Sequence, residues 1–262
     1  MPEEDLLYEK KDGIAIITLN RPHRMNALTM DIWTERLAAL WADFDGDSKA
    51  RVAILTATGD RAFCTGVDVK ATAESNQGGR RGPVGEIRAT PRQNKVSKPV
   101  ITAVNGLCGG GGLMFVSDSD IAIASPNAEF FNPGVGVGIV ALYGQAAWTK
   151  WVPFQSVMRM ALMGPGERIG AQRACELGIV TEVVEDKPLL DRAMEIAEIM
   201  GRNSPAAMRT AKKALWAALD AEGVAGALAA VNEVTKEYAG HPDQTEGPRA
   251  FAEKRKPNWQ EL

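Results

Sequence analysis

The stretch Pro99-Val-Ile-Thr-Ala-Val-Asn-Gly-Leu-Cys-Gly-Gly-Gly-Gly112 runs from an apolar segment into four consecutive glycines, and Leu113-Met-Phe-Val116 follows directly. Glycine weakens both strands and helices. Four glycines between two segments that look buried therefore indicate that another group comes close to this backbone. A free N–H at the start of the following helix would point into that space, which is the geometry that holds an oxyanion. The alternative is a flexible turn, but such turns usually also contain Ser, Asn, Asp or Pro.

Length and composition favour a large hydrophobic core. The chain has 262 residues, of which 45% are hydrophobic, so one domain with appended elements is as consistent with the sequence as two domains. The 30 basic and 33 acidic residues give a formal net charge of −3. This balance points neither to nucleic acid nor to an anionic membrane as a partner.

The cysteines and the N-terminus indicate a compartment. Cys64, Cys108 and Cys175 are an odd number without CxxC spacing, which argues against a disulfide framework and against a zinc site, so we expect no metal. The start, Met1-Pro-Glu-Glu-Asp5, lacks the basic and apolar regions of a signal peptide. No apolar run approaches the ~20 residues of a transmembrane helix. We therefore expect a soluble, cytoplasmic protein that does not bind membranes.

Strand and helix signals alternate through the first half of the chain. Asp12-Gly13 between two apolar runs predicts a hairpin, and Thr29 is placed to cap a helix with apolar residues at spacings of three and four. From about Tyr143 the pattern becomes mainly helical, and Ser204-Pro205 predicts the start of an alanine-rich helix. This alternation is typical of an α/β core. The predicted strands cover residues 6–10, 14–20, 52–57, 100–104 and 120–124.

A second glycine-containing turn resembles the first. Phe63-Cys-Thr-Gly-Val-Asp68 also follows a predicted buried strand, and the Asp68 carboxylate suits the N-cap of a short helix. Two backbone N–H groups that converge from two such turns would stabilise a negative oxygen, such as that of a thioester enolate. Removal of one donor of this type typically costs about 10²–10³ in rate.

At this level of detail the sequence resembles the enoyl-CoA hydratase/isomerase, or crotonase, superfamily. The resemblance follows the chain in order from about Leu6 to Pro257. It implies an α/β fold, a spiral of ββα units over residues 1–200, with a C-terminal helical region over residues 201–262 that builds homotrimers, often paired into hexamers. The motifs that carry it are Asn20-Arg-Pro-His-Arg-Met-Asn-Ala-Leu28, Ala62-Phe-Cys-Thr-Gly-Val-Asp68, Lys98-Pro-Val-Ile-Thr-Ala-Val-Asn-Gly106 with the glycine run, Gly166-Glu-Arg-Ile-Gly-Ala-Gln-Arg-Ala-Cys-Glu-Leu-Gly-Ile-Val-Thr-Glu-Val-Val184 and Phe251-Ala-Glu-Lys-Arg-Lys-Pro257.

The resemblance also implies roles for individual residues. Val67 and Gly111 occupy the positions whose N–H groups form the two halves of the oxyanion hole. No cofactor is implied, because CoA is part of the substrate. For the charged CoA-binding candidates the alternative is ordinary surface solvation. The residues that match the CoA-binding positions are Arg24, Ala27, Val67, Asp68, Val69, Lys70, Gly111, Phe251 and Lys254.

The chain departs from the family where proton transfer takes place. Hydratases of this family use two glutamates, and by resemblance these fall on Met114 and Gly134, neither of which transfers a proton. A shift of the alignment does not restore the pair, because the nearest acids are Asp118 and Glu129. A positioned general acid or base is worth about 10²–10⁴ in rate, so loss of both should disable ordinary alkene hydration.

Four side chains remain as replacements, and each also has a purely structural interpretation: Glu86, Asp118, Glu129 and Tyr143. His23 and His241 fall in motifs typical of a surface. A run of six basic residues with only Glu86 to offset it is by default a solvated face, although it would suit a substrate carboxylate or the CoA phosphates if it faced the pocket. The run is Arg80, Arg81, Arg88, Arg92, Lys95 and Lys98.

The sequence thus predicts an acyl-CoA-binding enzyme of the lyase or isomerase class that polarises a thioester carbonyl through backbone N–H groups. Two alternatives stay open. One is hydrolysis, decarboxylation or C–C cleavage of an unusual acyl-CoA, with a base from elsewhere in the pocket. The other is an acyl-CoA-binding protein that has lost its chemistry. An intact oxyanion hole without any proton-transfer group would favour the second alternative.

Overall fold

The predicted N-terminal hairpin is confirmed in the computed structural model, which describes residues 4–69, 71 and 87–260. Strand β1 (Leu6–Lys11) pairs antiparallel with β2 (Ile14–Leu19). Asp12 and Gly13 between them have φ values of 52° and 80°. Positive φ at both turn residues matches the twist of the flanking strands, and this is why Asp-Gly is a favoured hairpin turn.

A six-stranded sheet continues from this hairpin in the order β1-β2-β3-β5-β7-β10. All pairs after β1 and β2 are parallel. Strands β3 and β5 are buried along their whole length, which explains why they read as continuous apolar runs rather than as alternating ones. The added strands are β3 (Val52–Ala57), β5 (Val100–Val104), β7 (Ile121–Ala124) and β10 (Glu182–Val183).

A second, four-stranded sheet has the order β4-β6-β8-β9, with its first three strands parallel. Each of these three follows a strand of the large sheet in the chain, so β3 leads to β4, β5 to β6 and β7 to β8. The chain therefore adds one strand to each sheet per turn, and the expected spiral α/β fold is confirmed. The strands of this sheet are β4 (Ala62–Cys64), β6 (Leu107–Gly109), β8 (Glu129–Phe131) and β9 (Ile169–Gly170).

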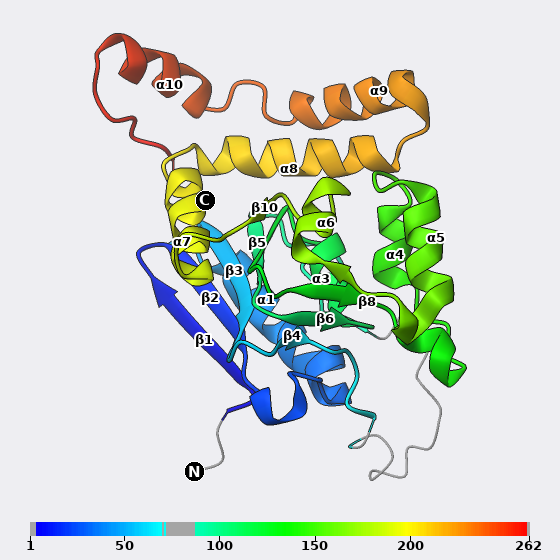
Figure 1. The fold of residues 1–262 in the computed structure, drawn as a ribbon. Helices are drawn as coiled ribbons and strands as arrows, with labels where there is room; N and C mark the ends of the chain where they lie inside the picture. The colour runs from blue at the N-terminus through cyan, green and yellow to red at the C-terminus, as the bar shows by residue number, and fades with distance from the viewer. Residues whose placement is uncertain (1–3, 70, 72–86, 261–262) are drawn as a thin grey trace.

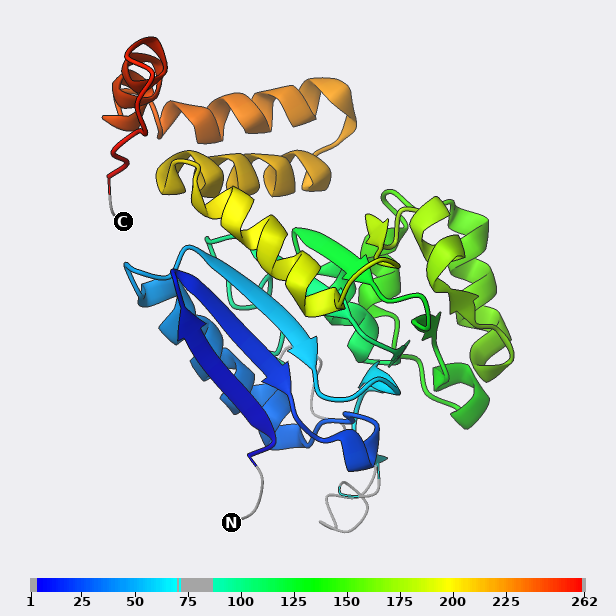
Figure 2. The ribbon, with the colours of Figure 1, turned by 60° about the vertical axis from the view of Figure 1, so that its left-hand side comes forward.

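Helices cover the sheets and fill the space between them (Figure 1). The predicted helix after Thr29 contains a π-helical turn, η2 (Ile32–Arg36), that continues into α1 (Leu37–Gly46). Figure 2 shows α7 lying across the large sheet, on which it packs with Ala193 and Ala197. The other helical segments are η1 (Pro22–Arg24), α3 (Gly112–Ser117), η4 (Gly134–Val137), α4 (Tyr143–Trp148), α5 (Phe154–Met163), η5 (Gly164–Gly166), α6 (Ala171–Glu176), α7 (Leu189–Gly201), α8 (Pro205–Asp220), α9 (Gly223–Lys236) and α10 (Asp243–Ala252).

The C-terminal helices form an extension at one end of the sheets (Figures 1 and 2). Ser204 caps α8 as predicted, because its side chain accepts a hydrogen bond from the Ala207 N–H at 3.1 Å. Leu215, Val224 and Leu228 on α8 and α9 are exposed apolar side chains. Trimer formation and the expected boundary near residue 200 stay predictions, and light scattering would measure the assembly.

Among the helices of the described residues, none has the length and apolarity needed to cross a bilayer.

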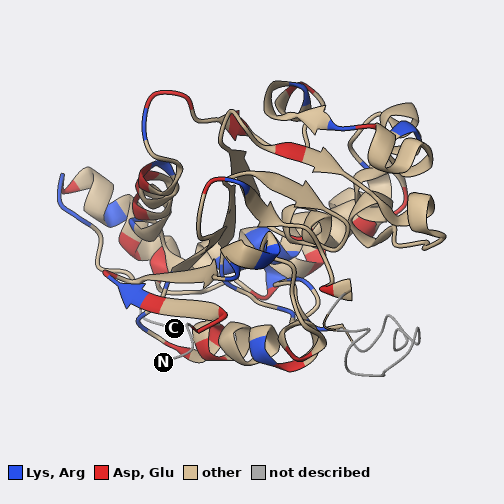
Figure 3. Ribbon diagram, turned by 60° about the horizontal axis from the view of Figure 1, so that its bottom comes forward, with Lys and Arg blue, Asp and Glu red and all other residues tan. Residues whose placement is uncertain are grey.

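Acidic and basic residues are interspersed over the fold (Figure 3), and two members of the basic run have structural partners. Lys98 is buried, and its Nζ donates to the carbonyls of Phe44 at 2.9 Å and Asp47 at 2.6 Å, at the end of α1. Burial lowers the pKa of this ammonium group. Arg92 pairs with Asp220 at 2.8 Å. Arg80 and Arg81 lie outside the described residues.

The close contact between α3 and β4 yields a stability prediction. A Cβ atom at Gly112 would lie 2.2 Å from the Cys64 carbonyl oxygen, whereas one at Gly46 would meet nothing within 4 Å. Gly112→Ala should therefore cost about 3 kcal/mol or more in the free energy of unfolding. Gly46→Ala, the matched control in a helix, should change it by less than about 1 kcal/mol. Urea denaturation of both variants measures the difference, and equal stabilities would show that the contact is not tight.

Candidate active site

The strand register brings the two glycine-containing turns together. Cys64 at the end of β4 and Cys108 in β6 are neighbouring partners of the parallel pair, so the turns that follow them leave the sheet side by side. Burial raises the pKa of the Cys64 thiol to about 12, so this group stays neutral. A Cβ atom at Gly66 would lie only 2.9 Å from the Gly111 nitrogen, and Gly66 has a φ of 96°. Only glycine at position 66 permits this approach.

Backbone pairing sets the direction of the Val67 N–H. The Leu28 N–H donates to the Gly66 carbonyl at 2.8 Å, and the Asp68 N–H donates to the Leu28 carbonyl at 2.9 Å. In this parallel bridge the N–H of the residue in between, Val67, faces away from Leu28. Within the described part of the chain, neither the Val67 N–H nor the Gly111 N–H has an acceptor. Two unpaired N–H groups on closely approaching turns are ready to hold an oxygen atom.

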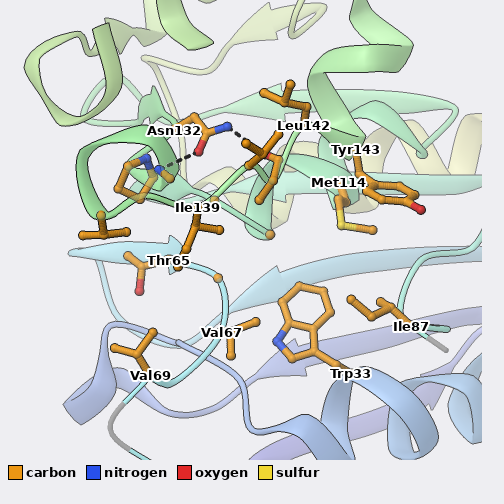
Figure 4. A pocket seen from close by; sticks show the side chains of 18 of the residues that line it. Trp33, Thr65, Val67, Val69, Ile87, Met114, Asn132, Ile139, Leu142 and Tyr143 are labelled. Carbon is orange, nitrogen blue, oxygen red and sulfur yellow. Dashed lines mark hydrogen bonds between the residues drawn. The ribbon is translucent and has the colours of Figure 1, made fainter. Parts of the chain in front are cut away.

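A cavity of about 470 Å³ opens beside these turns (Figure 4). Its wall is mostly aliphatic and aromatic. Of the described lining residues, Tyr143 is the sole one with an ionisable side chain, and Thr65, Asn132 and Trp33 are the others whose side chains carry a polar group. The lining residues are Met30, Trp33, Thr65, Gly66, Val67, Val69, Ile87, Gly110, Gly111, Met114, Asn132, Pro133, Gly134, Val137, Ile139, Val140, Ala141, Leu142, Tyr143 and Ala146.

Met114 and Gly134, which by the resemblance are expected to stand at the family's glutamate positions, both border this cavity. Met114, from α3, is 6% exposed and presents a thioether. Gly134 begins η4, and its N–H donates to the Asn132 side-chain oxygen at 2.9 Å. A Cβ atom at Gly134 would lie 2.5 Å from the Ile139 carbonyl oxygen. The backbone here therefore requires glycine, and no larger side chain fits without rearrangement of residues 134–139.

Three of the four possible replacement groups can be placed. Asp118, at the end of α3, accepts a hydrogen bond from the Thr90 hydroxyl at 2.6 Å and does not line the cavity, while burial raises the pKa of its carboxyl group. Glu129 pairs with Arg168 at 2.7 Å, also away from the cavity. Tyr143 does line the cavity and is 49% exposed. Glu86 lies outside the described residues.

Asp68 has a structural role beneath the Val67 turn. Its carboxylate pairs with Arg21 at 3.1 Å and accepts a hydrogen bond from the Ala71 N–H at 3.1 Å, which confirms the predicted N-cap. Burial by itself would raise the pKa of Asp68, but the Ala71 hydrogen bond and the Arg21 charge together hold it below its ordinary value. The ion pair anchors the turn that presents the Val67 N–H.

The other predicted CoA-binding residues are spread over the surface. Val69 lines the cavity and is 63% exposed, whereas Arg24 on η1 and Ala27 lie beyond its wall. Lys70 is not among the described residues. A CoA role of these residues stays a prediction.

The C-terminal pair is not brought to the cavity of its own chain. Phe251 on α10 is 88% exposed and Lys254, just after α10, is also exposed, and neither lines the cavity. Figure 1 places α10 at the far end of the C-terminal helices from α4. Contact with CoA in another subunit stays a prediction.

Several cavity residues were not singled out from the sequence. Trp33 repeats with Met30 and Leu37 at helical spacing, so the sequence pattern marks it only as part of a helix face. Ile139 and Leu142 come from an irregular segment between η4 and α4, and no periodic pattern marks such a segment. The one available signal was Pro133-Gly-Val-Gly-Val-Gly138, a second dense glycine run.

Comparison with known proteins agrees with this geometry. The family model described as enoyl-CoA hydratase/isomerase matches residues 9–262. The chain is 33% identical to the short-chain-enoyl-CoA hydratase of Clostridium acetobutylicum over 98% of this chain and 97% of that protein. It is 37% identical to the mevalonyl-coenzyme A hydratase of Aspergillus fumigatus, over 94% and 91% of the two chains. The crystal structure of an enoyl-CoA hydratase/isomerase from Mycobacterium paratuberculosis superposes with a TM-score of 0.86 at 41% identity, over 98% of each chain.

The chain therefore belongs to the enoyl-CoA hydratase/isomerase family, as its sequence motifs indicated. The relatives are matched over nearly their full length, so the similarity includes both sheets and the C-terminal helices.

The buried Asp68–Arg21 pair predicts a dependence of stability on pH. Because the pKa of Asp68 is lowered in the folded protein, its contribution is complete above the unfolded value of about 4 and is lost as the pH falls through the lower folded value. Asp68→Asn should cost about 3 kcal/mol at pH 7, and this deficit should shrink below pH 4. Denaturant unfolding from pH 7 to pH 3 measures it. As the control, Asp31→Asn, which removes an exposed pair with Arg36, should change the free energy of unfolding little at any pH. A deficit for Asp68→Asn that does not depend on pH would contradict the lowered pKa of Asp68.

Proposed function

We propose that this protein binds an acyl-CoA thioester and holds its carbonyl oxygen between the backbone N–H groups of Val67 and Gly111. The observation that carries the proposal is the convergence of the two turns, with a built Cβ at Gly66 only 2.9 Å from the Gly111 nitrogen. The relatives named above act, by their names, on CoA thioesters. In such a site the two donors stabilise the enolate oxygen that forms when charge moves from the α-carbon onto the thioester carbonyl.

The apolar wall supports this role. Few protein dipoles compete with the two N–H groups, and in a water-poor cavity an electrostatic contact is stronger than in bulk solvent. Donors fixed by the backbone need no reorganisation as charge develops. We propose that the acyl chain lies against Met114, Ile139 and Leu142, and that the CoA arm leaves past Val69 toward Arg24.

Ordinary hydration is not the reaction that we propose. Water addition needs a group that activates water and one that delivers a proton to the α-carbon, and Met114 and Gly134 at the family's positions do neither. Two functions fit better. One is hydrolysis, decarboxylation or C–C cleavage of an unusual acyl-CoA, with Tyr143 or Glu86 as the remaining proton-transfer candidates. The other is binding of acyl-CoA without chemistry; the names of the relatives, which are hydratases, favour an enzyme.

Two measurements on the native chain test the proposal together. Calorimetry with acyl-CoAs of several lengths should detect binding that is tighter than that of free CoA. Hydration of crotonyl-CoA should be absent, or lower by several powers of ten than in a family hydratase bearing both glutamates, since each lost group is worth about 10²–10⁴. Failure to bind any acyl-CoA would remove the proposed site. Robust hydration would show that another residue supplies the protons.

A pair of variants at Gly111 isolates the backbone donor. A side chain at this position would meet the Trp33 ring, with a built Cβ 2.9 Å from two ring carbons, so one substitution alone mixes two effects. Gly111→Ala adds the Cβ and keeps the N–H, whereas Gly111→Pro adds it and removes the N–H. Relative to Gly111→Ala, Gly111→Pro should weaken acyl-CoA binding about tenfold and lower any turnover by about 10²–10³. Equal behaviour of the two folded variants would place the donor elsewhere.

A further inference from the structure

One wall of the cavity contains a buried polar group that the proposed oxygen site does not yet use. Trp33 is 1% exposed and lines the cavity, yet its Nε1–H has no hydrogen-bond acceptor among the described residues. A buried donor without an acceptor costs about 1–3 kcal/mol, so such groups are uncommon unless a ligand or water completes them. Trp41, eight residues further along the same helical segment, donates its Nε1–H to the Ala89 carbonyl at 2.7 Å. Of the two tryptophans on this helical segment, Trp33 is therefore the one without an acceptor among the described residues.

The backbone around Trp33 is also unusual. It lies in the π-helical turn η2, in which the Leu37 N–H bonds back to the Ile32 carbonyl. The Trp33 carbonyl accepts a hydrogen bond from the Arg88 N–H at 3.0 Å, so a segment outside the helix stabilises this turn. Single π-helical turns are rare and are found frequently at functional sites. Here the turn fixes the direction in which the indole leaves the helix.

Packing then holds the indole against the Gly111 turn. Its ring stacks on Phe115 with centroids 5.3 Å apart. Its outer carbons lie against Gly111, where a built Cβ would be 2.9 Å away. Figure 4 shows that the ring edge bearing the nitrogen faces Val67. The N–H groups of Val67, Gly111 and Trp33, for which the described residues offer no acceptor, thus come from three different elements that line one cavity.

We propose that the Trp33 Nε1–H is a third hydrogen-bond donor to the oxygen of the bound acyl thioester, and so a residue that selects thioesters over free CoA. This inference rests on the proposed function. An enolate oxygen accepts three hydrogen bonds, and a donor on a ring packed between Phe115 and Gly111 is as preorganised as a backbone amide. Free CoA carries no oxygen at this point, so its binding should not involve Trp33.

The test compares two buried tryptophans whose Nε1–H groups both have no acceptor among the described residues. Trp148 is also buried with an unpaired Nε1–H, but it does not line the cavity, so Trp148→Phe is the matched control for Trp33→Phe. With octanoyl-CoA, Trp33→Phe should bind about tenfold more weakly than the native chain, and Trp148→Phe should bind as the native chain does. Neither variant should change the affinity for free CoA. Calorimetry measures all six affinities, those of the native chain and the two variants for each ligand.

A measurement on the native chain reports the bond directly. In a ¹H–¹⁵N spectrum the indole resonance of Trp33, identified through its contact with the Gly111 α-protons, should move downfield when octanoyl-CoA binds and stay in place with free CoA. This titration decides the question by itself if Trp33→Phe does not fold. Octanoyl-CoA binding that leaves this resonance in place and is unchanged in Trp33→Phe would overturn the role of Trp33 alone. No binding by the native chain would overturn the proposed function as well.

Discussion

The approach of two peptide backbones between Gly66 and Gly111 is the constraint on which the rest of the site depends. It follows from the pairing of β4 with β6, where Cys64 and Cys108 are partners and the turns leave the sheet together. Gly112 against the Cys64 carbonyl and Gly111 against Trp33 leave no room for a Cβ atom. The run of four glycines is thus a packing requirement of one junction, and the unpaired N–H groups are its consequence.

Around this junction the protein combines strong local anchoring with an apolar cavity. The Asp68–Arg21 pair fixes the Val67 turn from below, while Trp33 and Phe115 fix the Gly111 turn from the side. Charged groups near the cavity are engaged elsewhere, such as Glu129 with Arg168. An arrangement of this kind is suited to polarising one oxygen atom, because rigid donors in apolar surroundings act without reorganisation. Among the described residues that line the cavity, only Tyr143 has an ionisable side chain for moving protons.

Much of the fold was predictable because its signals are local. The Asp12-Gly13 hairpin, the buried strands at 52–57 and 100–104 and the Ser204 cap all depend on residues close in sequence. The family resemblance was equally accessible, since its motifs follow one another in order. The roles of Asp118 and Glu129 were not predictable. Each was a candidate by distance along the chain, and each is directed away from the cavity by partners 28 and 39 residues distant, Thr90 and Arg168.

The sequence by itself determined the family, the spiral of strands and helices and the two glycine turns, because these are properties of residue type and order. The loss of both family glutamates stays a prediction from the resemblance. Only the tertiary structure decided that Lys98 caps α1 rather than facing a ligand, that Asp68 anchors a turn and that Trp33 lines the cavity with no acceptor for its Nε1–H among the described residues. These facts depend on which segments meet across about 50 residues of chain or more. No pattern of neighbouring residues encodes such meetings, because they are set by strand register and by the packing of the helices between the two sheets.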